Sequence, residues 1–295
     1  MKGEERLAWI DSQMRTLQQL AGTITTSVAN LEPTEIILKQ IEEAARAVLV
    51  MENLVRVNRD LVGSPARSLI VGKRGTITAS QVSEGSSIPK LNPTYTPATI
   101  TPVKYGVGVE ITYEAIQSFH FDLINDWLKE AGYAMAKAKD SAILSEFYDT
   151  TTYSNIGSVD AATSGVLAYD DVISAVTWIR ANNFDPDTLV IHPNQAADLL
   201  KDTKFITYQA YGSREPILNG EIGQFAGVKV FVTTQATDGK ALVFDKKRAG
   251  ILVYKRPLTV RRREEPERDA ITIYVTEMYK AAILNEKAVC IIHNC

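Results

Sequence analysis

The chain has 295 residues, and its 45% hydrophobic and 23% charged content is the ordinary composition of a globular protein with a sizeable core. Its formal net charge of -3 argues against a surface that coats nucleic acid, because such surfaces are strongly basic. There is no apolar run of about 18 residues and no apolar stretch after Met1–Arg6, so we expect neither a membrane span nor secretion, and we place the protein in a cytoplasm at least initially.

Two short amphipathic helices are predicted at the N-terminus. The first spans residues 4–20, where apolar residues recur every three or four positions. A polar linker follows at 23–31, and the second helix begins at Pro33, because proline is tolerated in a first turn. We expect this helix to end before Val55, where β-branched residues alternate. Two interpretations stay open: the helices complete the core of their own subunit, or they form an arm that docks on a neighbouring one.

A long arm without helical periodicity is predicted from Ile70 to Thr112. Its middle, residues 84–93, is rich in Gly, Ser, Asn and Pro, which mark a tip or turn. Residues 103–112 alternate between apolar and polar or small side chains, which is typical of a half-buried strand. Pro97 and Pro102 precede this strand, and since proline cannot donate to a ladder, they place the outer part of the limb at a sheet edge or beyond it. The pattern predicts a projecting arm with two limbs.

The arm leads directly into a long helix. Apolar residues repeat at three- and four-residue steps from Tyr113, and His120–Asp122 is expected to divide the helix, with Asp122 as an N-cap. The long piece, residues 123–148, would span roughly 40 Å at about 1.5 Å per residue. Its narrow, alanine-rich stripe predicts close packing across a sheet as a structural spine.

Helices and short strands alternate after a polar loop at 150–165, which indicates a compact α/β subdomain. We expect helices at 169–182 and from His192 through Leu200, and strands at 189–191, 227–232 and 241–244. Beyond Gly250 long strands return. They are predicted at 251–254, 258–262, 270–275, 281–284 and 288–292, and they are expected to build the sheet on which the long helix packs.

Patterns that would carry catalysis or ligand binding are weak. The loop Gly72–Thr76 lacks the spacing of a phosphate-binding loop and does not lead into a helix. His120, His192 and His293 stand in unrelated contexts, which gives no local support to a metal site or a serine triad. We expect His192 to cap a turn and Asp185–Asp187 to be turn residues.

The cysteines and one charged run complete the candidates. Cys290 and Cys295 are too few for a disulfide framework and are not spaced with histidines as zinc ligands, so we expect reduced thiols. The basic run Arg261–Arg263 is followed at once by Glu264 and Glu265, which indicates charge pairing across a sheet edge or at a subunit contact, with a solvated loop as the alternative. We therefore expect no cofactor and no metal ion.

The order of these elements resembles the major capsid protein of tailed bacteriophages, the Hong Kong 97 type of shell protein. The resemblance rests on the N-terminal arm, the long β-arm with its Glu84–Pro89 tip, the alternating strand, the spine helix, and two stretches at 187–194 and 223–230 that are similar to the family's axial subdomain. It covers the chain from about Pro33 onward.

This resemblance implies an α+β capsid fold in five segments. They are an N-terminal arm at 1–65, an extended β-hairpin loop at 66–112, a peripheral domain with the spine helix at 113–167, an α/β axial domain at 168–248, and the return strands of the peripheral domain at 249–295.

The resemblance further implies a subunit that self-assembles into pentamers and hexamers of an icosahedral capsid enclosing double-stranded DNA, in a virion assembled in the host cytoplasm. No enzymatic activity is implied, and the partners would be other copies of the chain, DNA bound without sequence specificity, and separate scaffolding and portal proteins. A projecting arm cannot bury its own apolar residues, so we expect subunit contacts on the extended loop and the outer peripheral strands. The expected loop residues are Lys73, Arg74, Ile77, Val82, Glu84, Ile88, Lys90, Leu91 and Tyr95, and the expected strand residues are Arg261, Arg262, Arg263, Glu264 and Glu265.

Two other functions stay open. An encapsulin-type nanocompartment shell resembles the same architecture and would enclose a cargo protein. An α+β enzyme or small-molecule binding protein would instead fold the arm as a lid over a pocket, and it should purify as a small oligomer.

Overall fold

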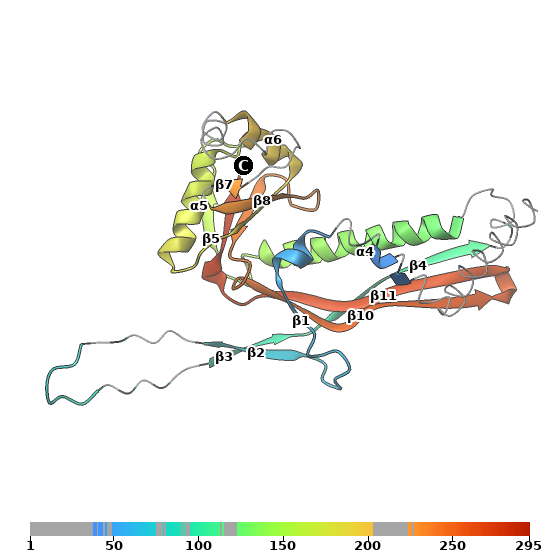
Figure 1. The fold of residues 1–295 in the computed structure, drawn as a ribbon, viewed down its shortest axis with the longest axis horizontal. Helices are drawn as coiled ribbons and strands as arrows, with labels where there is room; N and C mark the ends of the chain where they lie inside the picture. Colours follow the sequence, from blue (N-terminus) through green and yellow to red (C-terminus); the bar gives the residue numbers. More distant parts are fainter. Residues whose placement is uncertain are drawn as a thin grey trace, which may run out of the picture.

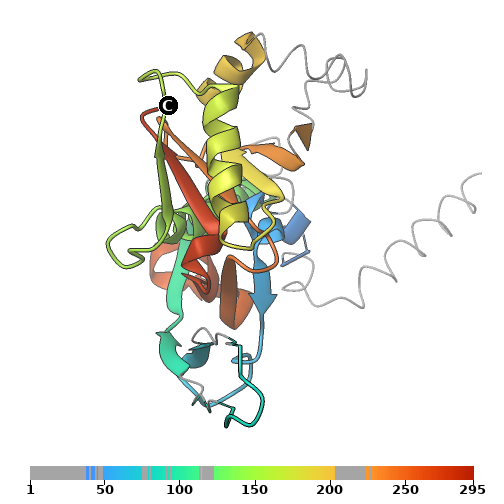
Figure 2. The ribbon, with the colours of Figure 1, turned by 90° about the vertical axis from the view of Figure 1, so that its left-hand side faces the viewer.

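The computed structural model describes residues 49–74, 95–112, 123–202 and 227–295, together with 38–39, 41–43, 45, 79, 81–88, 90, 92, 114 and 224–225. A body with two sheets carries a thin two-stranded ribbon that projects from it (Figure 1 and Figure 2). Within the described part of the chain, no helix is long and apolar enough to cross a membrane. The first predicted helix at 4–20, the break at His120–Asp122 and the polar loop at 203–223 lie outside the described residues.

A four-stranded sheet forms the longer part of the body. Its order is β1-β10-β11-β4, in which β1 runs parallel to β10 and the other neighbours are antiparallel. The strands are β1 (Arg56–Asn58), β10 (Gly250–Glu265), β11 (Ala270–Ile283) and β4 (Val103–Thr112). The 25-residue helix α4 (Leu123–Phe147) lies along one face, over β11 and β4 (Figure 1). The predicted spine helix is confirmed, and most of the sheet beneath it comes from C-terminal strands, as expected.

Strand β4 has the burial pattern that its alternation predicts. Tyr105, Val107 and Val109 are half-buried toward α4, and the residues between them are exposed. Gly108 provides room for a side chain of the neighbouring strand, because a Cβ here would lie 3.2 Å from two carbons of the Tyr274 ring. β4 is the last strand of its sheet as described.

The predicted return strands at 251–254 and 258–262 are one continuous strand, β10, so the expected interruption is wrong. A register shift in the pairing with β11 surrounds Pro257. β1 pairs with β10 only as far as Val253, so Pro257 stands where β10 has β11 alone as its neighbour. A missing N–H is tolerated at such a free edge, and the strand continues through the proline.

Strand β11 likewise joins the segments predicted separately at 270–275 and 281–284. The polar Glu277 interrupts the apolar alternation of the sequence. In the structure it is buried together with Val275 and Tyr279, which alternate with it along the strand. Because the acidic residue Glu277 stands at a buried position, the sequence predicted two strands where the structure has one.

A six-stranded sheet forms the second part of the body, in the order β5-β12-β9-β6-β8-β7. Its strands are β5 (Gly157–Asp160), β12 (Val289–His293), β9 (Lys240–Phe244), β6 (Thr188–Ile191), β8 (Val228–Val232) and β7 (Gln224–Phe225), and its helices are α5 (Tyr169–Ala181) and α6 (Pro193–Lys201). Helix α5 packs on β5, β12 and β9 (Figure 2). The predicted α/β subdomain is confirmed in its helices and in β6, β8 and β9.

Two strands of this sheet correct the sequence prediction. β12 was expected under the spine helix, but it lies between β5 and β9 in the six-stranded sheet. β5 falls in the segment that was predicted as a loop. Residues 289–292 of β12 are apolar and all buried. Such a run fits a central position in either sheet, so the sequence of β12 alone does not show which strands it pairs with.

The hydrophobic core passes from one sheet to the other at the C-terminal end of α4. The Phe147 side chain is fully buried in a cluster that includes Leu252 of β10 as well as Phe244 of β9 and Ile291 of β12. The ring centroids of Phe147 and Phe244 lie 5.2 Å apart. The backbone of Gly250 lies close to the Phe147 ring, since a Cβ at this position would lie 2.6 Å from Phe147 Cζ. One aromatic side chain thus joins α4 to both sheets.

The described part of the second predicted helix belongs to this same body. Ile41 is fully buried beside Leu128 and Met135 of α4. The 3-10 turn η1 (Met51–Leu54) follows, and β1 begins at Arg56, so the predicted end of the helix before Val55 is confirmed. Here the helix completes the core of its own subunit.

The ends of the α/β helices are closed by local hydrogen bonds and turns, and the predicted cap at His192 is one of them. Asp171 Oδ2 accepts the Ala168 N–H at 3.1 Å at the start of α5. His192 Nδ1 accepts the Asn194 N–H at 3.3 Å, which makes His192 the N-cap of α6. Asn183 has φ 65° just after α5, in the left-handed conformation that asparagine tolerates at a helix end.

The two cysteine thiols are expected to be unreactive in the folded subunit. Cys290 and Cys295 are free, as predicted, and both are buried, which raises the pKa of Cys290 to about 12 and the pKa of Cys295 to about 11. The thiolate is the reactive form. Alkylation by iodoacetamide at pH 8, followed by intact mass spectrometry, should therefore be slow until denaturant is added. Rapid labelling of either thiol without denaturant would contradict this burial.

Candidate subunit-interface surfaces

The predicted two-limbed arm begins as a two-stranded ribbon. β2 (Leu69–Arg74) and β3 (Tyr95–Ile100) pair antiparallel from Leu69 opposite Ile100 to Arg74 opposite Tyr95. The ribbon projects on the side of the four-stranded sheet away from α4 (Figure 1). Pro97 lies in this ribbon, outside the large sheets, as its position before the alternating strand predicts.

The ribbon is fixed to the body at its root. Ile100 is buried in an apolar cluster with Ile251 and Val253 of β10 and Ala282 of β11. Beside it, the Lys255 ammonium donates to the backbone carbonyls of residues 64 and 66, the second at 2.9 Å. The direction in which the ribbon leaves the body is therefore set by buried contacts.

Farther out, the ribbon and its tip expose large apolar side chains. Ile88 is 76% exposed, Ile70 is 67% exposed and Tyr95 is 63% exposed. The tip contains a turn in which Gly85 has φ 78° and the Ser86 N–H donates to the carbonyl of residue 83 at 3.1 Å, as the composition predicts. The body of the same chain leaves these apolar groups uncovered.

The structure places the remaining predicted loop residues as follows. Val82, Glu84 and Lys90 are exposed, Ile77 and Leu91 lie outside the described residues, and Lys73 and Arg74 are described in their backbone alone.

The predicted peripheral residues Arg261, Arg262, Arg263, Glu264 and Glu265 form the outer end of β10. Arg262 Nη2 lies 2.8 Å from Glu264 Oε1, and both side chains are largely exposed. Glu265 Oε1 accepts the Thr272 hydroxyl of β11 at 3.4 Å. The charges are thus paired partly within one chain, and such exposed pairs contribute roughly 0–1 kcal/mol.

The two predicted contact surfaces do not meet within one subunit. The ribbon and the outer end of β10 extend toward opposite ends of the molecule (Figure 1). Any contact between them therefore requires a second copy of the chain.

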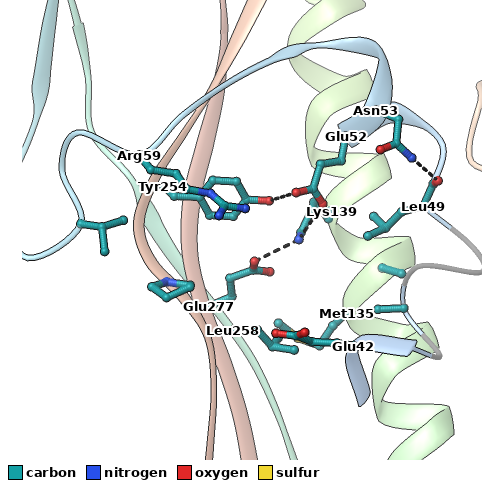
Figure 3. A pocket seen from close by; sticks show the side chains of 14 residues that line it. Glu42, Leu49, Glu52, Asn53, Arg59, Met135, Lys139, Tyr254, Leu258 and Glu277 are labelled. Carbon is teal, nitrogen blue, oxygen red and sulfur yellow. Dashed lines mark hydrogen bonds and ion pairs between the residues drawn. The ribbon is translucent and has the colours of Figure 1, made fainter. Parts of the chain in front are cut away.

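A buried ion-pair cluster, which the sequence did not predict, joins α4 to β10, β11 and η1 (Figure 3). Lys139 Nζ lies 3.1 Å from Glu52 Oε2 and 2.9 Å from Glu277 Oε1. The Tyr254 hydroxyl donates to Glu52 Oε1 at 2.7 Å. Lys139 is buried among partners 87 and 138 residues away in the sequence. No local pattern encodes such distant pairing.

Burial alters the ionisation of this cluster. It raises the pKa of Glu277 above the ordinary 4.5, against the opposing effect of Lys139. It also raises the pKa of Asp140, although this carboxylate accepts two backbone N–H groups. The pKa of Tyr254 is raised by the same cause, so its hydroxyl remains a donor at neutral pH.

A cavity of about 660 Å³ adjoins the cluster. Its lining comes from the segments around residues 42–62, 135–139 and 254–258 and from Glu277, and it includes no residue of the ribbon. Among the described residues, no three His, Cys, Asp or Glu side chains are grouped as a metal site would require.

Comparisons with known structures match this architecture over most of the chain. The capsid structure of the cyanophage P-SCSP1u has 17% sequence identity and a TM-score of 0.69, covering 83% of this chain and 88% of that one. The Mycobacterium phage Che8 structure has 16% identity and a TM-score of 0.65, covering 83% and 90%. The virus-like particle from Pyrococcus furiosus has 15% identity and a TM-score of 0.62, covering 89% and 100%. Among curated proteins, none matches the sequence.

The spine helix, the two sheets and the projecting ribbon define a shell subunit with the Hong Kong 97 type of capsid fold, as the sequence predicts. A family model described as phage capsid protein matches residues 95–292, which is more than half of the chain. The chain belongs to this family of phage capsid proteins.

Proposed function

We propose that this capsid protein assembles into pentamers and hexamers, which close into an icosahedral shell around double-stranded DNA. The observation that carries the proposal is the ribbon, which projects from the body with its apolar side chains uncovered (Figure 1). Burying one large apolar side chain stabilises a contact by about 1.5–3 kcal/mol. Since a closed shell repeats each contact many times, modest contacts between the ribbon of one subunit and the body of the next are sufficient.

The role in the virion is structural, without catalysis or a cofactor. Within this proposal the DNA is held without sequence specificity, separate scaffolding and portal proteins are partners, and assembly takes place in the host cytoplasm. The net charge of -3 supports a shell that encloses DNA without coating it tightly. We keep the division of the chain into five segments with one change. Strands β5 and β12 are assigned to the axial domain, because they belong to its six-stranded sheet.

The alternatives have less support. The likeness to the Pyrococcus furiosus particle extends over the whole of that chain, so the fold alone does not separate a virus from a compartment. The family match favours the phage capsid. An enzyme with the arm as a lid is less favoured, because the ribbon residues that line a second, smaller cavity, Ala98, Thr99 and Ile100, belong to the root of the ribbon, and the described lining of the cavity beside Lys139 contains none.

The exposed apolar residues of the ribbon provide the test. Ile88→Ser and Tyr95→Ser are expected to leave the stability of the free subunit unchanged within about 0.5 kcal/mol, since both side chains are exposed. Each should reduce the yield of closed shells at least about tenfold, because a loss of about 1.4 kcal/mol per contact has that effect on a single association constant. Yield is measured by size-exclusion chromatography and negative-stain microscopy.

Val166→Ser is the matched control, because Val166 is an exposed apolar residue of the body, 41% accessible and remote from the ribbon. It should assemble as the unmodified chain does. Equal shell yields from all three variants would contradict the proposed role of the ribbon.

A further inference from the structure

Residues 49–54, which precede β1, are docked on α4, where the Asp140 side chain caps their backbone N–H groups. The N–H groups of Val50 and Met51 donate to Asp140 Oδ2 and Oδ1, each at 3.0 Å. These donors stand at the start of η1, where backbone N–H groups otherwise have no partner. Asp140 is almost fully buried, so the docked segment covers the carboxylate that holds it.

Lys139, the preceding residue of α4, holds the same segment by charge. Its ammonium lies between Glu52 of η1 and Glu277 of β11, and Tyr254 of β10 supports Glu52 with a hydrogen bond (Figure 3). Through residues 49–54 this site adds a polar attachment to the apolar contact that Ile41 makes with α4.

The charges in the docked cluster do not balance. Three carboxylates, those of Glu52, Asp140 and Glu277, adjoin the single buried ammonium of Lys139. One oxygen of Glu277, Oε2, is buried without a hydrogen-bond partner. A buried charge of this kind costs far more free energy than its neutral form.

The remaining charged and titratable groups around the cluster are few. Arg59 lies at the edge of the cluster, with its guanidinium carbon 5.6 Å from the centroid of the Tyr254 ring, and its charge lowers the pKa of Glu277 less than that of Lys139 does. The ring of Tyr279 lies 5.6 Å from Lys139 Nζ, and its hydroxyl is buried without a partner. Glu42, from the helical residues 41–43, lines the same cavity and adds to the acidic side.

We propose that docking of residues 49–54 onto α4 takes up one proton, held by the Glu277 carboxyl, so that this segment is bound more firmly at mildly acidic pH than at neutral pH. The excess of carboxylates and the unpaired Glu277 oxygen carry the inference. The segment is thereby a proton-linked attachment point for the N-terminal part of the chain.

The direction of the pH dependence follows from linkage. Docking of residues 49–54 adds to the burial that raises the pKa of Glu277, so the contribution of this carboxyl to docking is complete below its pKa in the undocked state and is lost as the pH rises through its higher pKa in the docked state. Between the undocked and the docked pKa the docking constant should fall by up to about tenfold per pH unit, and above the docked pKa it should be constant.

Hydrogen exchange tests this proposal on the full-length, unassembled subunit. The opening of residues 49–58 is measured by mass spectrometry between pH 4.5 and 8.5, after correction for intrinsic exchange rates. The expected result is an opening constant that rises with pH in the unmodified chain and rises much less in Glu277→Gln, which keeps the acceptor for Lys139 but carries no charge. The dependence that stays in this variant comes from Asp140, whose pKa burial also raises. Glu267→Gln, a change at an exposed glutamate of η2, is the matched control and should keep the original profile.

A pH-independent opening in the unmodified chain would overturn the proposal, as would an unchanged pH profile in Glu277→Gln. Lys139→Met supplies a second test if Glu277→Gln does not fold. Removing the ammonium that lies between Glu52 and Glu277 should extend the pH dependence to higher pH, and a flat profile in this variant would also overturn the proposal.

Discussion

Replacing residues 75–94 by Asn-Gly is expected to give a folded, soluble subunit that no longer forms closed shells. Arg74 and Tyr95 are directly paired across the ribbon, so a two-residue turn can close the hairpin at this point without disturbing its root. The buried root contacts of Ile100 are retained. The removed residues include the exposed Ile88, which is available to another copy of the chain. Loss of assembly with retained folding is therefore the specific expectation.

This outcome is measured in two ways on the same preparation. The melting temperature should match that of the unassembled full-length subunit within about 4 °C, which corresponds to about 1 kcal/mol for a chain of this size class. Size-exclusion chromatography and negative-stain microscopy should show subunits or small oligomers at every concentration tested. Shells of normal size from the shortened chain would show that the ribbon tip does not hold subunits together.

Phe147→Ala is expected to destabilise the subunit by about 3–5 kcal/mol, the usual cost of truncating a fully buried phenylalanine. The reason is its position, since its ring contacts the cores of both sheets at the end of α4. Urea unfolding is best measured in the Asn-Gly variant, because assembly would otherwise add to the apparent stability. Phe147→Leu, which keeps most of the side-chain volume, is the control and should lose roughly 1–2 kcal/mol.

A loss below about 1 kcal/mol in Phe147→Ala would contradict the view of α4 as the element that unites the two sheets. Two separate unfolding transitions in the parent protein would contradict it as well, because a shared core predicts that the sheets unfold together.

Local sequence patterns were sufficient for the elements that bury one face. The alternation of residues 103–112 and the three- and four-residue spacing along α4 each reflect a single buried side, and both predictions are confirmed. The tip turn at Gly85 and the cap at His192 were also predicted, since they depend on neighbouring residues alone.

Features that depend on distant partners could not be predicted. β12 is buried on both faces, so its sequence fits a central position in either sheet, and only the fold decides between them. Pro257 interrupts the pattern of β10 without interrupting the strand, because β1 ends before reaching it. The burial of Lys139 could not be predicted either, because its partners Glu52 and Glu277 lie on other elements.

For the interface surfaces, the sequence located the exposed loop but could not show which surface of a second copy receives it. The structure gives a reason in Ile88 and Tyr95, whose side chains have no cover within their own chain. The surface that would cover these side chains lies on another molecule. Neither the periodicity nor the composition of one chain shows where that surface is.

The central claim is that this phage capsid protein closes into shells by contacts between its own copies. Size-exclusion chromatography of the purified full-length chain, with negative-stain microscopy of each peak, tests it most directly. We expect closed icosahedral shells in the high-molecular-weight fraction, and we expect the Asn-Gly variant to form none. A full-length chain that remains a monomer or dimer under all conditions would contradict it.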